Sequence, residues 1–148
     1  MRKIFIAAIA LIMFTGASQA FEPVNTGYFS NVTLDGYDTT AYFEKGQPHE
    51  GHKKFSHTYN GAEWHFLSKE DRDLFAKNPE NYAPQFGGYC SNQMSLGNLS
   101  DVDPHVWLIH KGKLYLFGHD VGLERWKREG IDKMISDATR HYNSYLAQ

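Results

Sequence analysis

The sequence predicts a small α+β domain with short antiparallel hairpins, short central helices and C-terminal helices. Two turn signals and one helical stripe carry this prediction. Asn60-Gly61 and Lys111-Gly112 each separate two apolar segments, and the last segment repeats apolar residues at intervals of three and four. A length of 148 residues fits one domain, and 15% aromatic residues are enough to form a hydrophobic core.

The first 20 residues have the features of a secretory signal peptide. Arg2 and Lys3 precede an uncharged apolar run, 4–14, and small residues follow up to Ala20. The run is about half as long as the roughly 20 apolar residues that span a bilayer. We therefore predict cleavage before Phe21 and export of residues 21–148 as one domain. The bacterial periplasm is the expected destination, with secretion as the alternative.

Charge and cysteine content exclude several classes of protein. The formal charge is −2, from 17 acidic and 15 basic residues, so there is no basic footprint for nucleic acid. One cysteine excludes a disulfide framework and a multi-cysteine zinc site. After the signal, no stretch is apolar enough to predict a membrane span.

The hairpin predicted over 55–67 turns at Asn60-Gly61, because both residues tolerate positive φ. Counting outward from the turn places three pairs on one aromatic face: Tyr59 with Ala62, His57 with Trp64, and Phe55 with Phe66. His65 then lies on the opposite face from His57, so these two histidines cannot hold one metal ion together.

The remaining elements are predicted from turn, cap and periodicity signals, and no internal repeat is apparent. In the first part we expect a short strand over 32–38, an apolar contact at 41–43 and a polar loop over 47–54. A helix follows, capped by Ser68 with Asp71 three residues on, and then a turn of helix that starts at Pro79. A bend at Gly87-Gly88 leads into a short helix over 91–96.

In the second part we expect a loop over 98–104 and a hairpin over 106–117, with Trp107, Ile109, Leu114 and Leu116 on one face. A helix capped by Asp120 ends near Gly130. The last helix has a buried stripe, formed by Ile131, Ile135, Ala138, Tyr142 and Tyr145.

Most of the exported chain, from Val32 to Trp126, resembles the YHS domain family. An ordered set of short pieces carries the resemblance: Leu34-Asp35-Gly36-Tyr37-Asp38, Ala41-Tyr42-Phe43, Tyr59-Asn60-Gly61, Phe66, Ser68, Phe75, Pro79, Tyr82, Pro84, Gly87-Gly88-Tyr89-Cys90, Asp103-Pro104, Trp107, Gly112-Lys113-Leu114-Tyr115-Leu116 and Trp126. The chain looks most like the exported single-domain branch. The resemblance implies a link to metals, since related short domains accompany heavy-metal pumps and metal chaperones.

One part of the family pattern is missing. Metal-handling relatives carry cysteines just before and within the helix that follows the hairpin, at positions that correspond here to Leu67 and Asp71. Their upstream cysteine has no counterpart around 34–38. The resemblance therefore implies the fold but not the thiolate cage, and Cys90 is the one thiol that remains.

Cys90 is the first candidate functional residue. A thiolate is the softest ligand and the best nucleophile that a protein offers. As the only cysteine in the chain, it cannot form an internal disulfide. It is therefore a metal ligand, a reactive thiol, or a buried inert thiol that packs as a small hydrophobe.

Four other residues are candidate metal ligands beside Cys90. Met94 shares a helix face with Cys90 if that segment is helical, and a thiolate with a thioether suits Cu(I). His105 and His119 lie at the open end of the second hairpin and could approach each other across it. The alternatives are a core methionine for Met94, a hydrogen-bonded core histidine for His57, and solvated side chains for His105 and His119.

Three functions remain open on the sequence. The leading hypothesis is binding, delivery or sequestration of a transition metal, copper before zinc, through Cys90 with nearby His or Met, with the metal ion or a metal-handling protein as partner. The second is a thiol-based redox protein that uses Cys90, and the third is an interaction module without a cofactor. No catalytic motif is apparent, so binding is favoured over enzymatic activity.

Overall fold

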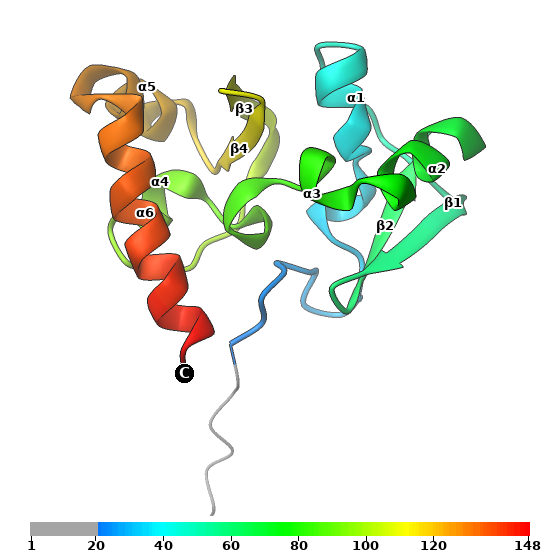
Figure 1. Ribbon diagram of the computed structural model, residues 1–148, viewed down its shortest axis with the longest axis horizontal. Helices are drawn as coiled ribbons and strands as arrows, with labels where there is room; N and C mark the ends of the chain where they lie inside the picture. Colours follow the sequence, from blue (N-terminus) through cyan, green and yellow to red (C-terminus); the bar gives the residue numbers. More distant parts are fainter. Residues whose placement is uncertain (1–20) are drawn as a thin grey trace, which may run out of the picture.

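The computed structural model describes residues 21–148, and the predicted signal peptide lies outside this range. The described chain contains two antiparallel two-stranded sheets and a set of short helices, which confirms the predicted α+β class (Figure 1). In chain order the elements are η1 (Leu34–Gly36), α1 (Thr39–Glu44), β1 (His52–Tyr59), β2 (Ala62–Phe66), α2 (Lys69–Lys77), α3 (Pro79–Tyr82), η2 (Gln85–Gly88), α4 (Ser91–Ser95), β3 (Asp103–His110), β4 (Lys113–Phe117), α5 (Asp120–Glu129) and α6 (Ile131–Leu146). Within this range no helix has both the length and the apolar composition needed to cross a membrane.

The same order of elements occurs twice. A 3-10 turn, a short helix, a hairpin and a longer helix follow one another over 34–77, called here the first half, and again over 85–129, the second half. The two 3-10 turns share an unusual backbone: φ is positive at Leu34, Asp35 and Gly36, and again at Phe86, Gly87 and Gly88. The prediction that the chain has no internal repeat is therefore wrong at the level of structure. Figure 1 shows the two halves side by side.

The first hairpin turns at Asn60-Gly61, as predicted, with φ of 49° and 78°. His57 pairs with Trp64 and Tyr59 with Ala62, which confirms the predicted faces near the turn.

The predicted pairing of Phe55 with Phe66 is wrong, because His52 pairs with Phe66 across an irregularity in β1. A Cβ on Gly51 would lie 2.5 Å from the His65 carbonyl carbon. Glycine therefore allows the start of β1 to approach β2 closely, and the strand begins at His52, inside the predicted polar loop.

The second hairpin turns at Lys111-Gly112, and its predicted inner face is confirmed. Leu114 and Leu116 are fully buried, and Trp107 and Ile109 pack with them against Tyr42 of α1. This cluster joins the two halves of the molecule.

The strand predicted over 32–38 is wrong. Three successive positive φ angles curl this segment into η1, and only isolated bridges remain, such as Val32 with Glu63. The following residues form α1, where an apolar contact was expected. Asp38 caps α1 by accepting a hydrogen bond from the backbone N–H of Thr40 at 2.8 Å.

The predicted helices are mostly confirmed. Ser68 caps α2 by accepting from the Asp71 N–H, Pro79 starts α3, and the segment after Cys90 forms α4. The predicted cap of α5 is wrong by one residue, because His119 occupies the N-cap position and Asp120 lies inside the first turn.

Helix α6 buries its predicted stripe. Ala138 is fully buried, and the other predicted residues of the stripe pack against the same core cluster. The sequence reading left out Met134, which is also buried there. This cluster also contains Trp126, Phe117 and Met94 and forms the core of the second half. A separate cluster around Phe75 and Trp64 forms the core of the first half.

Candidate functional site at Cys90

Cys90 occupies the N-cap position of α4, directly after the 3-10 turn η2. Its backbone N–H donates to the Ser100 carbonyl at 2.9 Å, and its own carbonyl accepts from the Met94 N–H at 2.8 Å. The residue is 4% exposed. The backbone on both sides of the thiol is thus fixed by hydrogen bonds.

The Cys90 side chain lines a cavity of about 550 Å³. This cavity, called here the Cys90 cavity, lies between α4, the loop before β3 and the start of α5. Its lining residues are Cys90, Asn92, Gln93, Ser100, Asp101, Val102, Asp103, Gly118, His119, Val121 and Gly122. Cys90 is thus a buried residue that borders this cavity.

The sulfur of Cys90 accepts a hydrogen bond from the backbone N–H of Gly118 at 3.3 Å. Gly118 is the first residue after β4, so the N–H donor lies at the end of the second hairpin. The hydrogen bond ties the sulfur to the end of the second hairpin.

The first half contains the counterpart of this contact. Asp38 is the N-cap of α1, as Cys90 is of α4, and the first residue after β2, Leu67, donates its N–H to the Asp38 carboxylate at 2.9 Å. The two halves therefore use the same backbone donor, once for a carboxylate and once for a sulfur. Cys90 lies where the first half places an anionic group.

His119 follows Gly118 and lines the mouth of the Cys90 cavity. Its side chain is exposed and makes no capping hydrogen bond to α5, although the residue occupies the N-cap position. Its counterpart in the first half, Ser68, caps α2 through its hydroxyl. The imidazole of His119 thus does not cap α5.

Two carboxylates complete the polar lining. Asp101 accepts a hydrogen bond from the side-chain amide of Asn25 at 3.2 Å. Asp103 accepts from the backbone N–H of His105 at 2.9 Å, and the pKa of Asp103 is lowered mainly by this bond, with the His105 side chain and the charge of His119 adding to it. Asp103 is therefore ionised at neutral pH.

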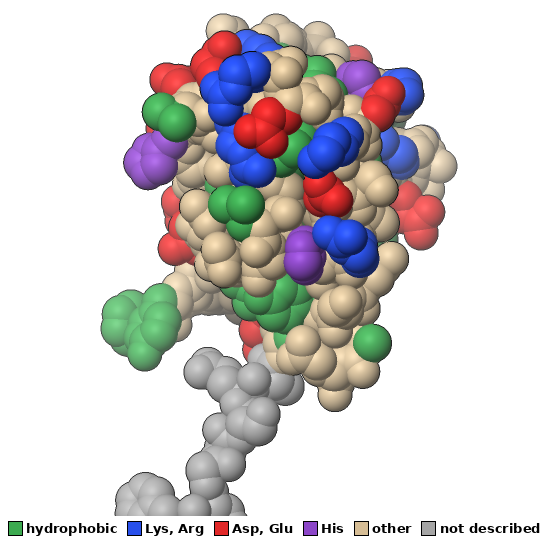
Figure 2. All heavy atoms as spheres, turned by 90° about the vertical axis from the view of Figure 1, so that its left-hand side faces the viewer, with side chains coloured by type: hydrophobic (Ala, Val, Ile, Leu, Met, Phe, Trp, Pro, Cys, Tyr) green, Lys and Arg blue, Asp and Glu red, His purple; other side chains and the backbone are tan. Residues whose placement is uncertain are grey.

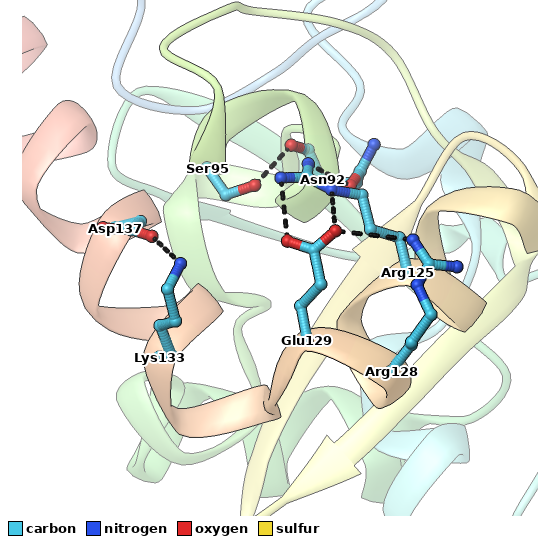
Figure 3. Close-up of polar contacts among 7 residues, drawn as sticks. All are labelled: Asn92, Ser95, Arg125, Arg128, Glu129, Lys133 and Asp137. Atoms are coloured by element: carbon cyan, nitrogen blue, oxygen red, sulfur yellow. Dashed lines mark hydrogen bonds and ion pairs between the residues drawn. The ribbon is translucent and has the colours of Figure 1, made fainter.

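Glycine and one side-chain network hold α5 against α4 (Figure 3). A Cβ on Gly122 would lie 2.8 Å from the Asn92 Cβ, so the two helices could not approach as closely with a larger residue. Arg125 donates to the Asn92 side-chain oxygen at 3.1 Å and to both oxygens of Glu129. This contact sets the position of His119, at the start of α5, relative to Cys90, at the start of α4.

The other predicted ligands lie elsewhere. Met94 is fully buried in the core of the second half, and it is not among the residues that line the Cys90 cavity. His57 lies in β1, with its ring edge toward Phe75 at 6.0 Å. His105 is bonded to Asp103 and packs against Tyr37. Of the predicted ligands, only Cys90 and His119 share a cavity.

Among residues 21–148, no group of three or more His, Cys, Asp and Glu side chains is arranged to hold a metal ion. The described side chains thus do not form a ready-made tetrahedral site of the kind that structural zinc occupies. They offer one thiol and one imidazole on a shared cavity.

Sequence reasoning missed Gly118, Asn92 and Gly122 as parts of this site. It placed His119 beside His105 across the hairpin, and not beside Cys90. The contact from Gly118 to Cys90 joins residues 28 positions apart and leaves no local pattern. The internal repeat is the one signal that could have indicated this contact, because Leu67 and Gly118 each follow the second strand of a hairpin.

Comparison with known proteins gives no match: no family model, no curated protein and no solved structure is similar to this chain. The class that the fold and the site define is a small α+β protein with a single cysteine beside a cavity lined by polar and apolar groups.

Proposed function

We propose that the protein binds Cu(I) in the Cys90 cavity, through the Cys90 sulfur and the His119 imidazole. The observation that carries the proposal is that these two side chains line one cavity, with a backbone N–H donated to the sulfur. Cu(I) is soft and is satisfied by few ligands, so one thiolate and one imidazole suit it better than they suit Zn²⁺, which takes four.

The resemblance to YHS domains supports the position of this site. The family's two helix-side thiolate positions correspond to Leu67 and Asp71, the residue after β2 and the third residue of α2. Their counterparts in the second half are Gly118 and Gly122, and both line the Cys90 cavity. The proposed site in the second half thus occupies the position that corresponds to the thiolate positions of metal-handling YHS domains in the first half.

A binding role follows from what the cavity offers. Its lining residues include one soft ligand, one imidazole and two carboxylates. In an exported protein these features suit capture of copper and its delivery or sequestration.

Native mass spectrometry of the chain starting at Phe21, mixed with Cu(I) or Zn(II), tests the proposal. Wild type is expected to retain one copper ion, and Cys90→Ser is expected to retain none. His119→Ala should weaken copper binding at least about tenfold in competition with a chromogenic chelator, since even outer residues of metal sites contribute that much. His52→Ala removes an exposed imidazole from β1 and should change nothing. Copper retained equally by wild type and Cys90→Ser would contradict the proposal.

A thiol-based redox function is the second candidate, because Cys90 is a free thiol whose residue lines a cavity. It predicts a fast reaction of Cys90 with hydrogen peroxide to give a sulfenic acid, with no copper retained by wild type. Mass spectrometry of the oxidised protein distinguishes this function from copper binding.

A further inference from the structure

With His119 neutral, the charged side chains that line the Cys90 cavity are all carboxylates. Asp101 and Asp103 are lining residues, and no Lys or Arg of the described chain lines it. Asp120 follows His119 at the mouth and is exposed. The adjoining cavity shares Asp101 and Val102 with this one and adds the carboxylate of Asp35. Cys90 therefore shares its cavity with two carboxylates, Asp35 lines the adjoining cavity, and Asp120 follows a lining residue in the chain.

Elsewhere on the second half, charges of both signs alternate. Over the face formed by α5 and α6, acidic and basic side chains are interspersed (Figure 2). Many of them are paired, as in Lys133 with Asp137 at 2.9 Å and Lys127 with Glu124 at 2.7 Å. The acidic lining of the Cys90 cavity is thus a local feature and not a consequence of the small overall charge.

The guanidinium of Arg125 is the cationic group bonded to a lining residue, Asn92, but Arg125 does not itself line the cavity. It also donates to both carboxylate oxygens of Glu129, at 3.0 and 3.3 Å (Figure 3). Glu129 offsets part of this charge, since it also accepts from Arg128 at 3.4 Å. The hydrogen bonds from His105 keep Asp103 ionised, so the cavity stays negative at neutral pH.

A concave site with charges of one sign concentrates ions of the other sign and repels ions of the same sign. Such clefts change the rate of association by about 10-fold to 1,000-fold, and the effect falls as salt is added. The field acts on any charged molecule that reaches the sulfur, whether or not it carries a metal.

We infer that the Cys90 cavity admits cationic ligands to the sulfur and excludes anionic ones. This inference rests on the proposed copper site for its biological meaning. Copper would then reach Cys90 as the bare Cu(I) ion or on a neutral or cationic carrier. An anionic thiolate complex of copper would be a poor donor.

Two thiol reagents of similar size and opposite charge test the inference. In alkyl methanethiosulfonates the Cys90 thiolate attacks the sulfenyl sulfur, a mixed disulfide forms, and methanesulfinate leaves with the electron pair of the broken S–S bond. One reagent carries a trimethylammonium group and the other a sulfonate. The measured quantity is the ratio of their rates on the chain starting at Phe21, at about pH 8, where free histidine is neutral.

The same chain unfolded in urea gives the reference ratio, because it contains the same thiol without the cavity. The folded protein should favour the cationic reagent at least about tenfold more than the unfolded chain does at low salt. This preference should shrink as salt is added, because the Debye length falls to about 3 Å at 1 M.

Asparagine variants identify the carboxylates responsible. In the double variant Asp101→Asn and Asp103→Asn, the amide oxygens can still accept from Asn25 and from the His105 N–H, so the loop is preserved. We expect the preference for the cationic reagent to fall at least about threefold. Asp73→Asn removes an exposed carboxylate from α2, in the other half, and should leave the ratio unchanged.

Three results would overturn the inference: equal ratios in the folded and unfolded chain, a ratio that the double variant leaves unchanged, or no reaction of folded protein with either reagent. Failure here is distinguishable from failure of the copper proposal. Copper retained by a protein without charge preference overturns only the inference. A clear charge preference in a protein that binds no copper overturns only the copper proposal.

Discussion

The two halves of the molecule share a backbone design but use it differently. In the first half, the buried carboxylate of Asp38 accepts from the N–H groups of Thr40 and Leu67 and from the Thr40 hydroxyl, at 2.7 to 2.9 Å. In the second half, Cys90 takes the same position and its sulfur accepts the Gly118 N–H at 3.3 Å. The first half thus satisfies three donors at this position, and the second half places a thiol that accepts one donor and borders a cavity.

The helix caps show the same contrast. Ser68 stabilises α2 through its hydroxyl, and a cap of this kind contributes about 1 kcal/mol. His119, at the equivalent position of α5, makes no capping bond. Helix α5 therefore lacks the stabilisation of a side-chain cap, and the His119 imidazole lies at the mouth of the Cys90 cavity. Residues that give up a structural contact in one copy of a repeat are good candidates for function.

The largest expected effect separates the two N-cap residues, Asp38 and Cys90. Asp38→Ala leaves two buried donors of Thr40 and the part-buried N–H of Leu67 without an acceptor, so we expect a loss of about 3 kcal/mol or more in the free energy of unfolding. Cys90→Ala removes one N–H acceptor and a small side chain and should cost about 1 kcal/mol. Urea unfolding followed by tryptophan fluorescence measures both. Equal losses would mean that Cys90 is a structural residue like Asp38.

The next effect concerns the approach of α5 to α4. Gly122→Ala places a methyl group against Asn92, so we expect a loss of about 1–3 kcal/mol and weaker copper binding as His119 moves away from Cys90. Lys127→Ala, at an exposed position of the same helix outside the cavity lining, is the control and should change stability by less than about 0.5 kcal/mol and copper binding not at all. Copper affinity that stays at the wild-type level in a destabilised Gly122→Ala protein would show that the position of His119 is not set by this contact.

A smaller effect is expected at the start of the described chain. Phe21 packs against Tyr89, Tyr142 and Tyr145, with ring centroids 5.1 to 6.0 Å apart, so Phe21→Ala should cost about 1–2 kcal/mol. Phe29 is 96% exposed, and Phe29→Ser should change stability by less than about 0.5 kcal/mol. Thermal unfolding of the two variants compares these values, and a larger loss for Phe29→Ser would contradict the packing described here.

The smallest effect is a difference in acid titration. Burial raises the pKa of Asp38, whereas the His105 N–H lowers that of Asp103, so their carboxyl ¹³C shifts should titrate above and below the ordinary value of 3.8. The stability that Asp38 contributes through its raised pKa is present below 3.8 and is lost as the pH rises through its folded value. For Asp103 it is present above 3.8 and is lost as the pH falls through its folded value. Coincident midpoints would contradict the contrast between the two carboxyls.

Local signals in the sequence predicted the elements well. Asn60-Gly61, Lys111-Gly112, Ser68 and the stripe of α6 each act through neighbouring residues, and all four predictions are confirmed. The segment 32–38 was misread because three successive positive φ angles, two of them at residues other than glycine, have no reliable signature.

The site was only partly predictable. Cys90 and His119 were identified by residue type, but their shared cavity depends on contacts between distant segments. The repeat was invisible because its halves keep backbone geometry and buried positions while the residues differ: Phe75 corresponds to Trp126, and Asp38 to Cys90. Chemistry at a duplicated position becomes apparent only when the two backbones are compared.

The most direct test of the account compares copper retention by wild type and by Cys90→Asp in native mass spectrometry. Aspartate at this position reproduces the first half, because it can accept the Gly118 N–H and cap α4 as Asp38 caps α1. The account predicts a folded Cys90→Asp protein that retains no Cu(I), whereas wild type retains one ion. Equal retention of copper by both proteins would contradict the claim that the thiol of the second half is its metal ligand.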